Sequence, residues 1–153
     1  MRRAFLVLVA CAALLAACGG DDSEPSPARA VVNVGGASVT ADIADDEASR
    51  ARGLSGRDRL DADAGMLFVL PGDAPSFWMK DMRFPIDIVW IKGGRVVDVT
   101  ADVPPPAGTN EALATYSPDR PANRALEVNA GWAARHGVER GDRVRVRRAG
   151  GSG

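Results

Sequence analysis

The chain has 153 residues, of which 46% are hydrophobic, 25% charged and 5% aromatic, proportions typical of one globular domain rather than of a disordered or fibrous chain. The 19 basic and 20 acidic residues nearly cancel, which argues against nucleic acid as a partner, because neutralising phosphates requires a strong basic excess. One histidine and two cysteines provide too few ligands for a Cys/His zinc cluster, so the sequence predicts neither a metal site nor a cofactor.

The first 18 residues have the pattern of a secretion signal. Two arginines near the start precede an apolar run from Ala4 to Leu15, and Ala16 and Ala17 stand directly before Cys18. This arrangement resembles a bacterial lipoprotein signal, which implies that cleavage removes residues 1–17 and leaves a diacylglycerol on Cys18. The apolar run is shorter than the roughly 20 residues that a membrane-spanning helix needs. We therefore expect a lipid anchor that holds the protein at the extracytoplasmic face of a cell-envelope membrane.

The rest of the chain divides into three parts. Residues 18–30 are polar and without periodicity, and predict a flexible tether behind the lipidated cysteine. Residues 31–148 carry the apolar patterns and form the single predicted domain, and residues 149–153 form a small-residue tail with nothing to bury. Cleavage would also remove Cys11, so the domain is expected to hold together without a disulfide.

The first half of the domain alternates mostly with a period of two. Residues 31–34 and 38–43 predict two strands joined by a turn at Gly35-Gly36, since glycine tolerates the positive φ angles of a tight hairpin. Acidic residues 45–47 are typical of a helix start, and Gly53 of its end. The apolar run 65–70 is short enough for a buried strand.

The second half continues with short strands. Strands are predicted over residues 77–79 and 86–91, and the turn Lys92-Gly93-Gly94-Arg95 joins the second of these to a strand over 96–99. Three consecutive prolines, residues 104–106, predict a long loop over residues 102–118, and long loops often bind ligands.

The end of the domain completes the fold prediction. A strand over residues 124–128, a helical turn over 131–136 and an alternating strand over 143–147, with its valines facing inward, follow one another. The sum is an α+β, β-rich domain: a small closed or nearly closed barrel of about seven short strands with two short helices, because closure removes exposed strand edges.

A set of short motifs resembles one known family. From residue 47 to residue 144, these motifs occur in the family's order: Glu47-Ala-Ser-Arg-Ala-Arg-Gly-Leu54, Gly65-Met-Leu-Phe-Val69, Phe77-Trp-Met-Lys80, Pro85-Ile-Asp87, Leu126-Glu127, Ala130-Gly131-Trp132 and Gly141-Asp142-Arg-Val144. Over about residues 36–147 the chain resembles domain of unknown function 192. The resemblance implies a small, secreted or membrane-attached β-rich domain, and it implies no established reaction.

Asp87 is the sharpest candidate site residue, because a carboxylate within a mostly apolar strand is costly unless it is paired or hydrogen-bonded. The structural interpretation is an ion pair with Arg52 or Arg83, or acceptance of backbone N–H groups. The functional interpretation makes Asp87 the polar anchor of a ligand cleft. Alternation exposes Trp78 and Lys80 on one face of their strand, so these two residues are candidates for the same cleft.

Glu127 is a second carboxylate within an apolar strand, and strict alternation would point it outward from the sheet. If Glu127 and Asp87 converged, the pair could act as acid and base in the hydrolysis of an envelope glycan. This enzyme is the alternative to the favoured function, a non-enzymatic binding or accessory module of the cell envelope.

A stripe of basic residues lies near the C-terminus. Alternation places Arg143, Arg145 and Arg147 on one face of the last strand. Such stripes are commonly solvated, but on a lipid-tethered domain this one could contact anionic headgroups or an acidic envelope polymer. The expected partners are thus the membrane, through Cys18, and a small ligand or an envelope polymer.

Overall fold

The structure is a computed structural model that describes residues 27–108 and 114–149. The predicted signal, Cys18 and most of the predicted tether lie outside the described residues. So does the middle of the predicted loop, residues 109–113.

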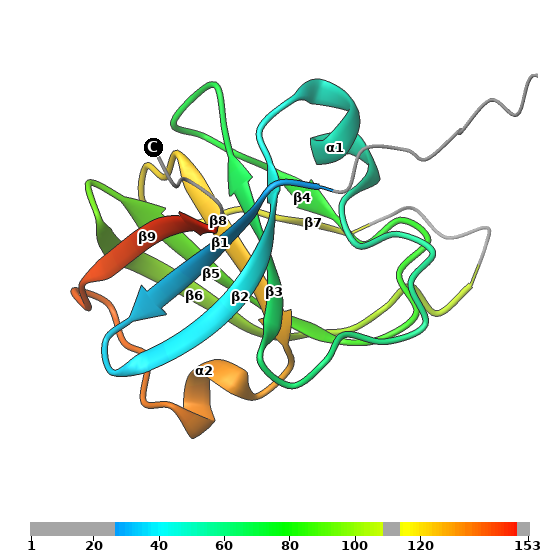
Figure 1. The fold of residues 1–153 in the computed structure, drawn as a ribbon. Coiled ribbons are helices and arrows are strands. Elements are labelled where there is room, and N and C mark those ends of the chain that lie inside the picture. Colours follow the sequence, from blue (N-terminus) through cyan, green and yellow to red (C-terminus); the bar gives the residue numbers. More distant parts are fainter. Residues whose placement is uncertain (1–26, 109–113, 150–153) are drawn as a thin grey trace, which may run out of the picture.

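Seven strands form one curled sheet in the order β6-β5-β8-β3-β2-β1-β9, and two further strands, β4 and β7, form a small second sheet (Figure 1). The elements in chain order are β1 (Arg29–Val34), β2 (Ala37–Ala44), α1 (Glu47–Arg52), β3 (Ala64–Val69), β4 (Phe77–Trp78), β5 (Ile86–Lys92), β6 (Arg95–Val103), β7 (Thr115–Tyr116), β8 (Arg124–Asn129), α2 (Trp132–Arg135) and β9 (Val144–Ala149). Within this part of the chain, no helix is long and apolar enough to cross a membrane.

The sheet curls until its two edge strands meet. Arg95 at the start of β6 forms a bridge with Arg143, the residue before β9. On either side of it, the backbone N–H of Val96 donates to the carbonyl of Asp142 (2.9 Å), and the N–H of Val144 donates to the carbonyl of Gly94 (2.8 Å). The predicted nearly closed, β-rich barrel with two short helices is therefore confirmed.

Local sequence signals explain the first hairpin and the first helix. Gly35, with φ of 58°, makes the turn between β1 and β2. Asp46 caps α1, because its carboxylate accepts the N–H of Ser49 (2.8 Å), and this hydrogen bond lowers the pKa of Asp46. Helix α1 then carries the chain across to β3, which runs parallel to β2.

The predicted loop over residues 102–118 is wrong at both ends. Strand β6 continues to Val103, where it pairs with Ile86 across a β-bulge. Strand β7 pairs with β4 through only two residues on each side, Phe77 with Tyr116 and Trp78 with Thr115. Elements this short leave no periodicity that a sequence pattern can reveal.

The two faces of the sheet bury two separate cores. The inner core fills the curled sheet, is closed at one end by Trp132 of α2, and takes residues from all seven strands, including Val32, Val39, Leu67, Val89, Val96, Leu126 and Val144. The outer core lies on the opposite face of β3, β5 and β8, beneath loops and the small sheet. Its members include Leu54, Phe68, Met79, Met82, Ile88, Trp90 and Ala125.

Candidate ligand-binding cleft

Asp87 is fully buried on β5 and binds backbone N–H groups. The N–H groups of Asp102 (2.9 Å) and Gly131 (3.0 Å) donate to its Oδ1 atom. The N–H of Ala133 (2.9 Å) donates to Oδ2. One carboxylate thus joins the end of β6 and the start of α2 to strand β5.

This geometry agrees with the structural interpretation of Asp87. Asp102 and Gly131 both have positive φ, 52° and 73°, so the carboxylate holds two backbone segments in unusual conformations. The ion-pair alternative is not observed for Arg83, which donates to Asp58 instead. Three N–H donors can compensate the desolvation of a buried carboxylate without a cation.

Trp78 and Lys80 are exposed, and their neighbours Phe77 and Met79 turn toward the outer core, as alternation predicts. Trp78 is 56% exposed. Phe77 packs edge-on between Phe68 and Trp90, with ring centroids 4.9 Å and 5.1 Å apart.

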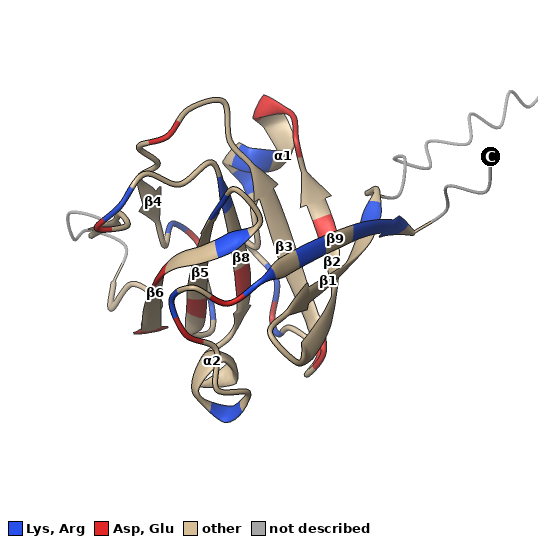
Figure 2. Ribbon diagram, turned by 90° about the vertical axis from the view of Figure 1, so that its left-hand side faces the viewer, with Lys and Arg blue, Asp and Glu red and all other residues tan. Residues whose placement is uncertain are grey.

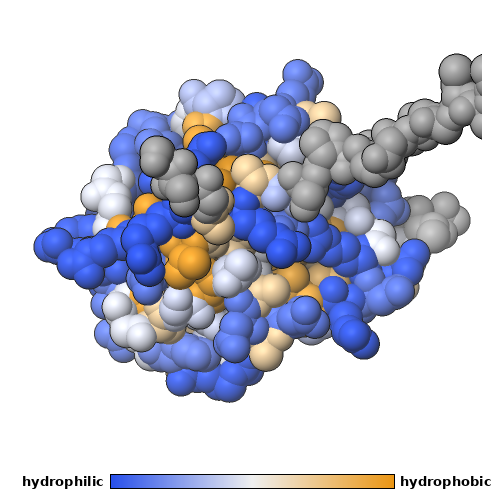
Figure 3. All heavy atoms as spheres, viewed as in Figure 1, coloured by the Kyte–Doolittle hydropathy of each residue, from blue (hydrophilic) through white to orange (hydrophobic). Residues whose placement is uncertain are grey.

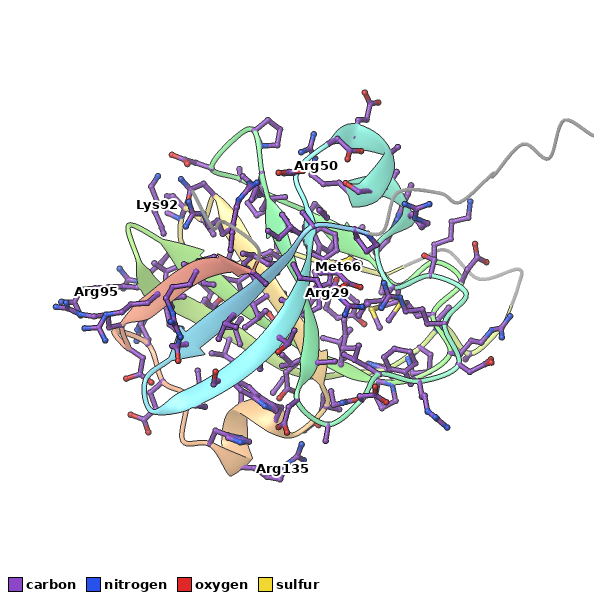
Figure 4. All side chains as sticks on the ribbon, in the orientation of Figure 1. Arg29, Arg50, Met66, Lys92, Arg95 and Arg135 are labelled. Atoms are coloured by element: carbon purple, nitrogen blue, oxygen red, sulfur yellow. The ribbon has the colours of Figure 1, made fainter. Side chains whose placement is uncertain are left out.

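A cleft of about 340 Å³ opens where α1, the end of β3 and β4 meet. Its walls are mostly apolar, and Arg50 and Arg52 of α1 add positive charge. Arg50 lies beside α1, above the sheet (Figure 4), and its guanidinium donates to the carbonyls of Asp45 (2.7 Å) and Val69 (3.1 Å). The residues that line the cleft include Glu47, Arg50, Leu54, Phe68, Trp78 and Glu127.

Glu127 is a buried carboxyl group in the wall of this cleft. The side chain projects from β8 toward the outer core and is only 6% exposed. Burial raises the pKa of Glu127 to about 8, so the carboxyl group is protonated at neutral pH. Within residues 27–108 and 114–149 it makes no ion pair or hydrogen bond.

The predicted site residues are therefore divided among three places. Of the three predicted cleft residues, Trp78 lines this cleft, and Lys80 and Asp87 do not. Asp87 and Glu127 do not converge either. Asp87 pairs with Val128 across the β5–β8 ladder and Ile88 pairs with Glu127, which places the two carboxyl groups on opposite faces of the sheet.

The predicted basic stripe lies elsewhere, on the edge strand β9. Arg145 and Arg147 are exposed there, and so is Arg143 just before the strand. Figure 2 shows β9 as a nearly continuous basic strip along the edge of the sheet.

The sequence interpretation missed the arginines of the cleft. Arg50 and Arg52 belong to α1, where they also fit the ordinary preference for basic residues in the last turn of a helix. The only sequence signal for a basic site here was a pair of arginines two residues apart in a short helix. The fold, and not this pair alone, places them beside Trp78 and Glu127.

Two solved structures are similar to the chain. One, from Sinorhizobium meliloti 1021, is described as a candidate transcription regulator; it shares 28% identity with a TM-score of 0.65, over 78% of this chain and 92% of that one. The other, from Novosphingobium aromaticivorans DSM 12444, is a protein of unknown function with 29% identity and a TM-score of 0.65, over 76% of this chain and 83% of that one. No curated protein matches the chain. The model of an uncharacterised conserved family, DUF192, matches residues 30–146, and the chain belongs to this family.

Proposed function

We propose that this protein is a lipid-anchored, extracytoplasmic binding module of the cell envelope, and that the cleft between α1 and β4 holds its ligand. The observation that carries this proposal is Glu127, a buried carboxyl group in the cleft wall without a hydrogen-bond partner in the described parts of the chain. The side chain keeps 6% exposure at the cleft, where a bound ligand would supply the hydrogen-bond partner.

The protonation state of Glu127 indicates which ligand group would face it. A protonated carboxyl donates one hydrogen bond, so the buried end of the ligand should present an acceptor oxygen. Arg50 in the cleft wall is a cation whose guanidinium contacts only backbone carbonyls among the described residues, those of Asp45 and Val69. The protonated carboxyl and this guanidinium both favour a carboxylate or a similar oxyanion over an ammonium group.

The apolar side chains of the cleft indicate what the rest of the ligand should be like. Leu54 and Phe68 are buried beneath the cleft, and the exposed ring of Trp78 stands at its edge. An apolar or flat-faced body would bury surface against these side chains, since clefts of this kind bind through apolar contact and orient through a few polar groups. The proposed ligand is thus a small amphipathic carboxylate.

The sequence supports the cellular location. The lipoprotein-like signal ends at Cys18, and a signal of this kind directs a protein out of the cytoplasm and leaves a lipid on the cysteine. Mass spectrometry of the protein purified from a bacterial membrane tests the anchor directly. A diacylglycerol-modified Cys18 at the N-terminus is the expected product, and an unprocessed chain or a chain cleaved at another residue would contradict it.

The cleft can be tested with three probes that share one body and differ in the head group: phenylbutyrate, phenylbutyramide and phenylbutylamine. The protein used is the chain from residue 18 onward with Cys18→Ser, because the sheet and both helices lie within residues 29–149. Calorimetry should give the tightest binding for the carboxylate. Its affinity should fall about tenfold or more between about pH 6 and about pH 9.5, as Glu127 loses its proton.

Glu127→Gln provides the matched variant, because its amide still donates a hydrogen bond but does not titrate. It should bind phenylbutyrate at both pH values with nearly the same affinity. Tightest binding by the amine would show a cation site and contradict the proposed ligand class. Failure of all three probes at millimolar concentration would contradict the cleft as a site for amphipathic ligands of this size.

A further inference from the structure

The outer surface of β9 and β1 is strongly basic and takes no part in the cleft. Arg145 lies opposite Asn33 of β1, and Arg147 lies opposite Val31, so the neighbouring outward positions carry no charge. Figure 3 shows hydrophilic residues extending across this side of the molecule around a smaller hydrophobic area.

The basic surface continues from β9 onto β6, across the place where these two edge strands meet. Arg95 bridges to Arg143, and these two side chains and Arg145 line a shallow hollow of about 380 Å³ beside the Gly93-Gly94 turn. Arg95 extends outward at the edge of the sheet (Figure 4). We define the β9 face as the four residues Arg95, Arg143, Arg145 and Arg147.

Two acidic side chains beside β9, Asp142 and Asp45, are engaged with other groups. Asp142, in the loop before β9, accepts the backbone N–H of Glu139 (2.9 Å). Asp45 pairs with Arg148 (3.0 Å) rather than with a residue of the β9 face. The guanidinium groups of Arg143, Arg145 and Arg147 make no ion pair in the described part of the chain, so the face keeps its positive charge.

The position of the face relative to the expected anchor indicates its partner. Arg29, which begins β1, pairs with Ala149 at the end of β9, so the tether joins the domain beside this face. Ten residues separate Cys18 from Arg29. They reach at most about 36 Å, so a lipid on Cys18 would keep the β9 face close to the bilayer.

We propose that the β9 face docks on an anionic phospholipid surface. Alternate arginines on a strand stand about 7 Å apart and project from one side, a spacing that allows each guanidinium to meet a separate headgroup. Binding a flat surface would orient the domain on the membrane. The inference does not depend on the cleft, and it uses the anchor only to explain why this face meets lipid.

The test measures partitioning of the chain from residue 18 onward, with Cys18→Ser, onto vesicles by co-sedimentation. Vesicles of seven parts phosphatidylcholine to three parts phosphatidylglycerol are compared with pure phosphatidylcholine. The parent should bind only the anionic vesicles. The triple variant R143Q/R145Q/R147Q should bind them about 100-fold more weakly, which is about fivefold, or about 1 kcal/mol, for each arginine.

Two further variants separate charge from folding. R143K/R145K/R147K keeps the charge and should bind within a few-fold of the parent. R59Q/R120Q/R135Q makes the same change in net charge with exposed arginines outside the β9 face, and Figure 4 shows Arg135 beside α2, away from Arg95. This control should keep most of the binding.

Equal loss in both glutamine variants would mean that net charge alone acts, and it would overturn the inference. Binding unchanged in R143Q/R145Q/R147Q would overturn it as well. One other outcome is that the parent protein fails to bind anionic vesicles and yet binds soluble polyglutamate through the same arginines. That result would overturn the inference and assign the face to an acidic polymer instead.

Discussion

Asp87 and Glu127 lie on adjacent antiparallel strands, and their carboxyl groups project from opposite faces of the sheet. Asp87 points into the inner core and receives three backbone N–H groups. Glu127 points into the outer core, where burial keeps it protonated at neutral pH and the cleft gives it an opening. One carboxyl group is therefore used to build the fold, and the other is available to a ligand.

The role of Asp87 predicts a change in stability without a change in binding. In Asp87→Asn an amide NH₂ must face at least one of the N–H donors, so a charge-assisted hydrogen bond is lost and a donor is left buried. We expect the free energy of unfolding to fall by about 2–4 kcal/mol in urea denaturation. The affinity for phenylbutyrate should not change.

Asp58→Asn is the matched control for Asp87→Asn. Asp58 is exposed and pairs at the surface with Arg83, so its loss should change the free energy of unfolding by less than about 1 kcal/mol. Equal effects of the two substitutions would show that the three N–H contacts of Asp87 do not stabilise the fold.

The raised pKa of Glu127 predicts stability that falls with pH. The folded protein keeps this proton up to about pH 8, whereas the unfolded chain releases it near pH 4.5. The stabilisation is therefore complete below about pH 4.5 and is lost as the pH rises to about 8. At 1.36 kcal/mol per pKa unit the loss is on the order of 5 kcal/mol, and above pH 8 the contribution levels off.

Glu127→Gln removes this titration and should be more stable than the parent at pH 8.5, with little difference at pH 4.5. Denaturant unfolding at a series of pH values measures both. Parallel stability curves for the two proteins across this range would mean that Glu127 titrates normally in the folded state.

Gly65 is required by close packing rather than by a turn. It lies in β3 between β2 and β8, where an added Cβ would come within 2.8 Å of the Glu127 carbonyl and 2.9 Å of Val39 Cγ1. Gly65→Ala should therefore force the strands apart and cost about 1–3 kcal/mol. Gly72→Ala is the control, since nothing lies within 4 Å of its added Cβ, and it should leave the melting temperature nearly unchanged.

The sequence predicted those elements that carry a local signal. Alternation and paired glycines located the hairpins of β1–β2 and β5–β6, and the acidic start and Gly53 bounded α1. The parallel pairing of β2 with β3 was not predicted, because it depends on where the chain from α1 returns to the sheet. Strand β7 is held by two pairs alone and leaves no pattern.

The candidate site was harder to predict, because a side chain's environment depends on what covers each face. Ile86 to Ile91 are buried throughout, so β5 has no polar face from which the direction of Asp87 could be inferred. Glu127 does project to the outer side of the sheet, as alternation suggested. That side is covered by a second core, so a position expected in solvent is buried.

Substitution of Trp78 should weaken ligand binding with little effect on the stability of the fold. Its ring is 56% exposed at the edge of the cleft, so Trp78→Ala removes little packing and should shift the melting temperature by only a few degrees. Loss of the ring contact should weaken phenylbutyrate about fivefold to tenfold, corresponding to about 1 kcal/mol. Lys80→Ala, two residues away and outside the cleft, should bind like the parent. If instead Lys80→Ala weakens binding and Trp78→Ala does not, the ligand lies on the exposed surface of this segment, and the cleft is not its site.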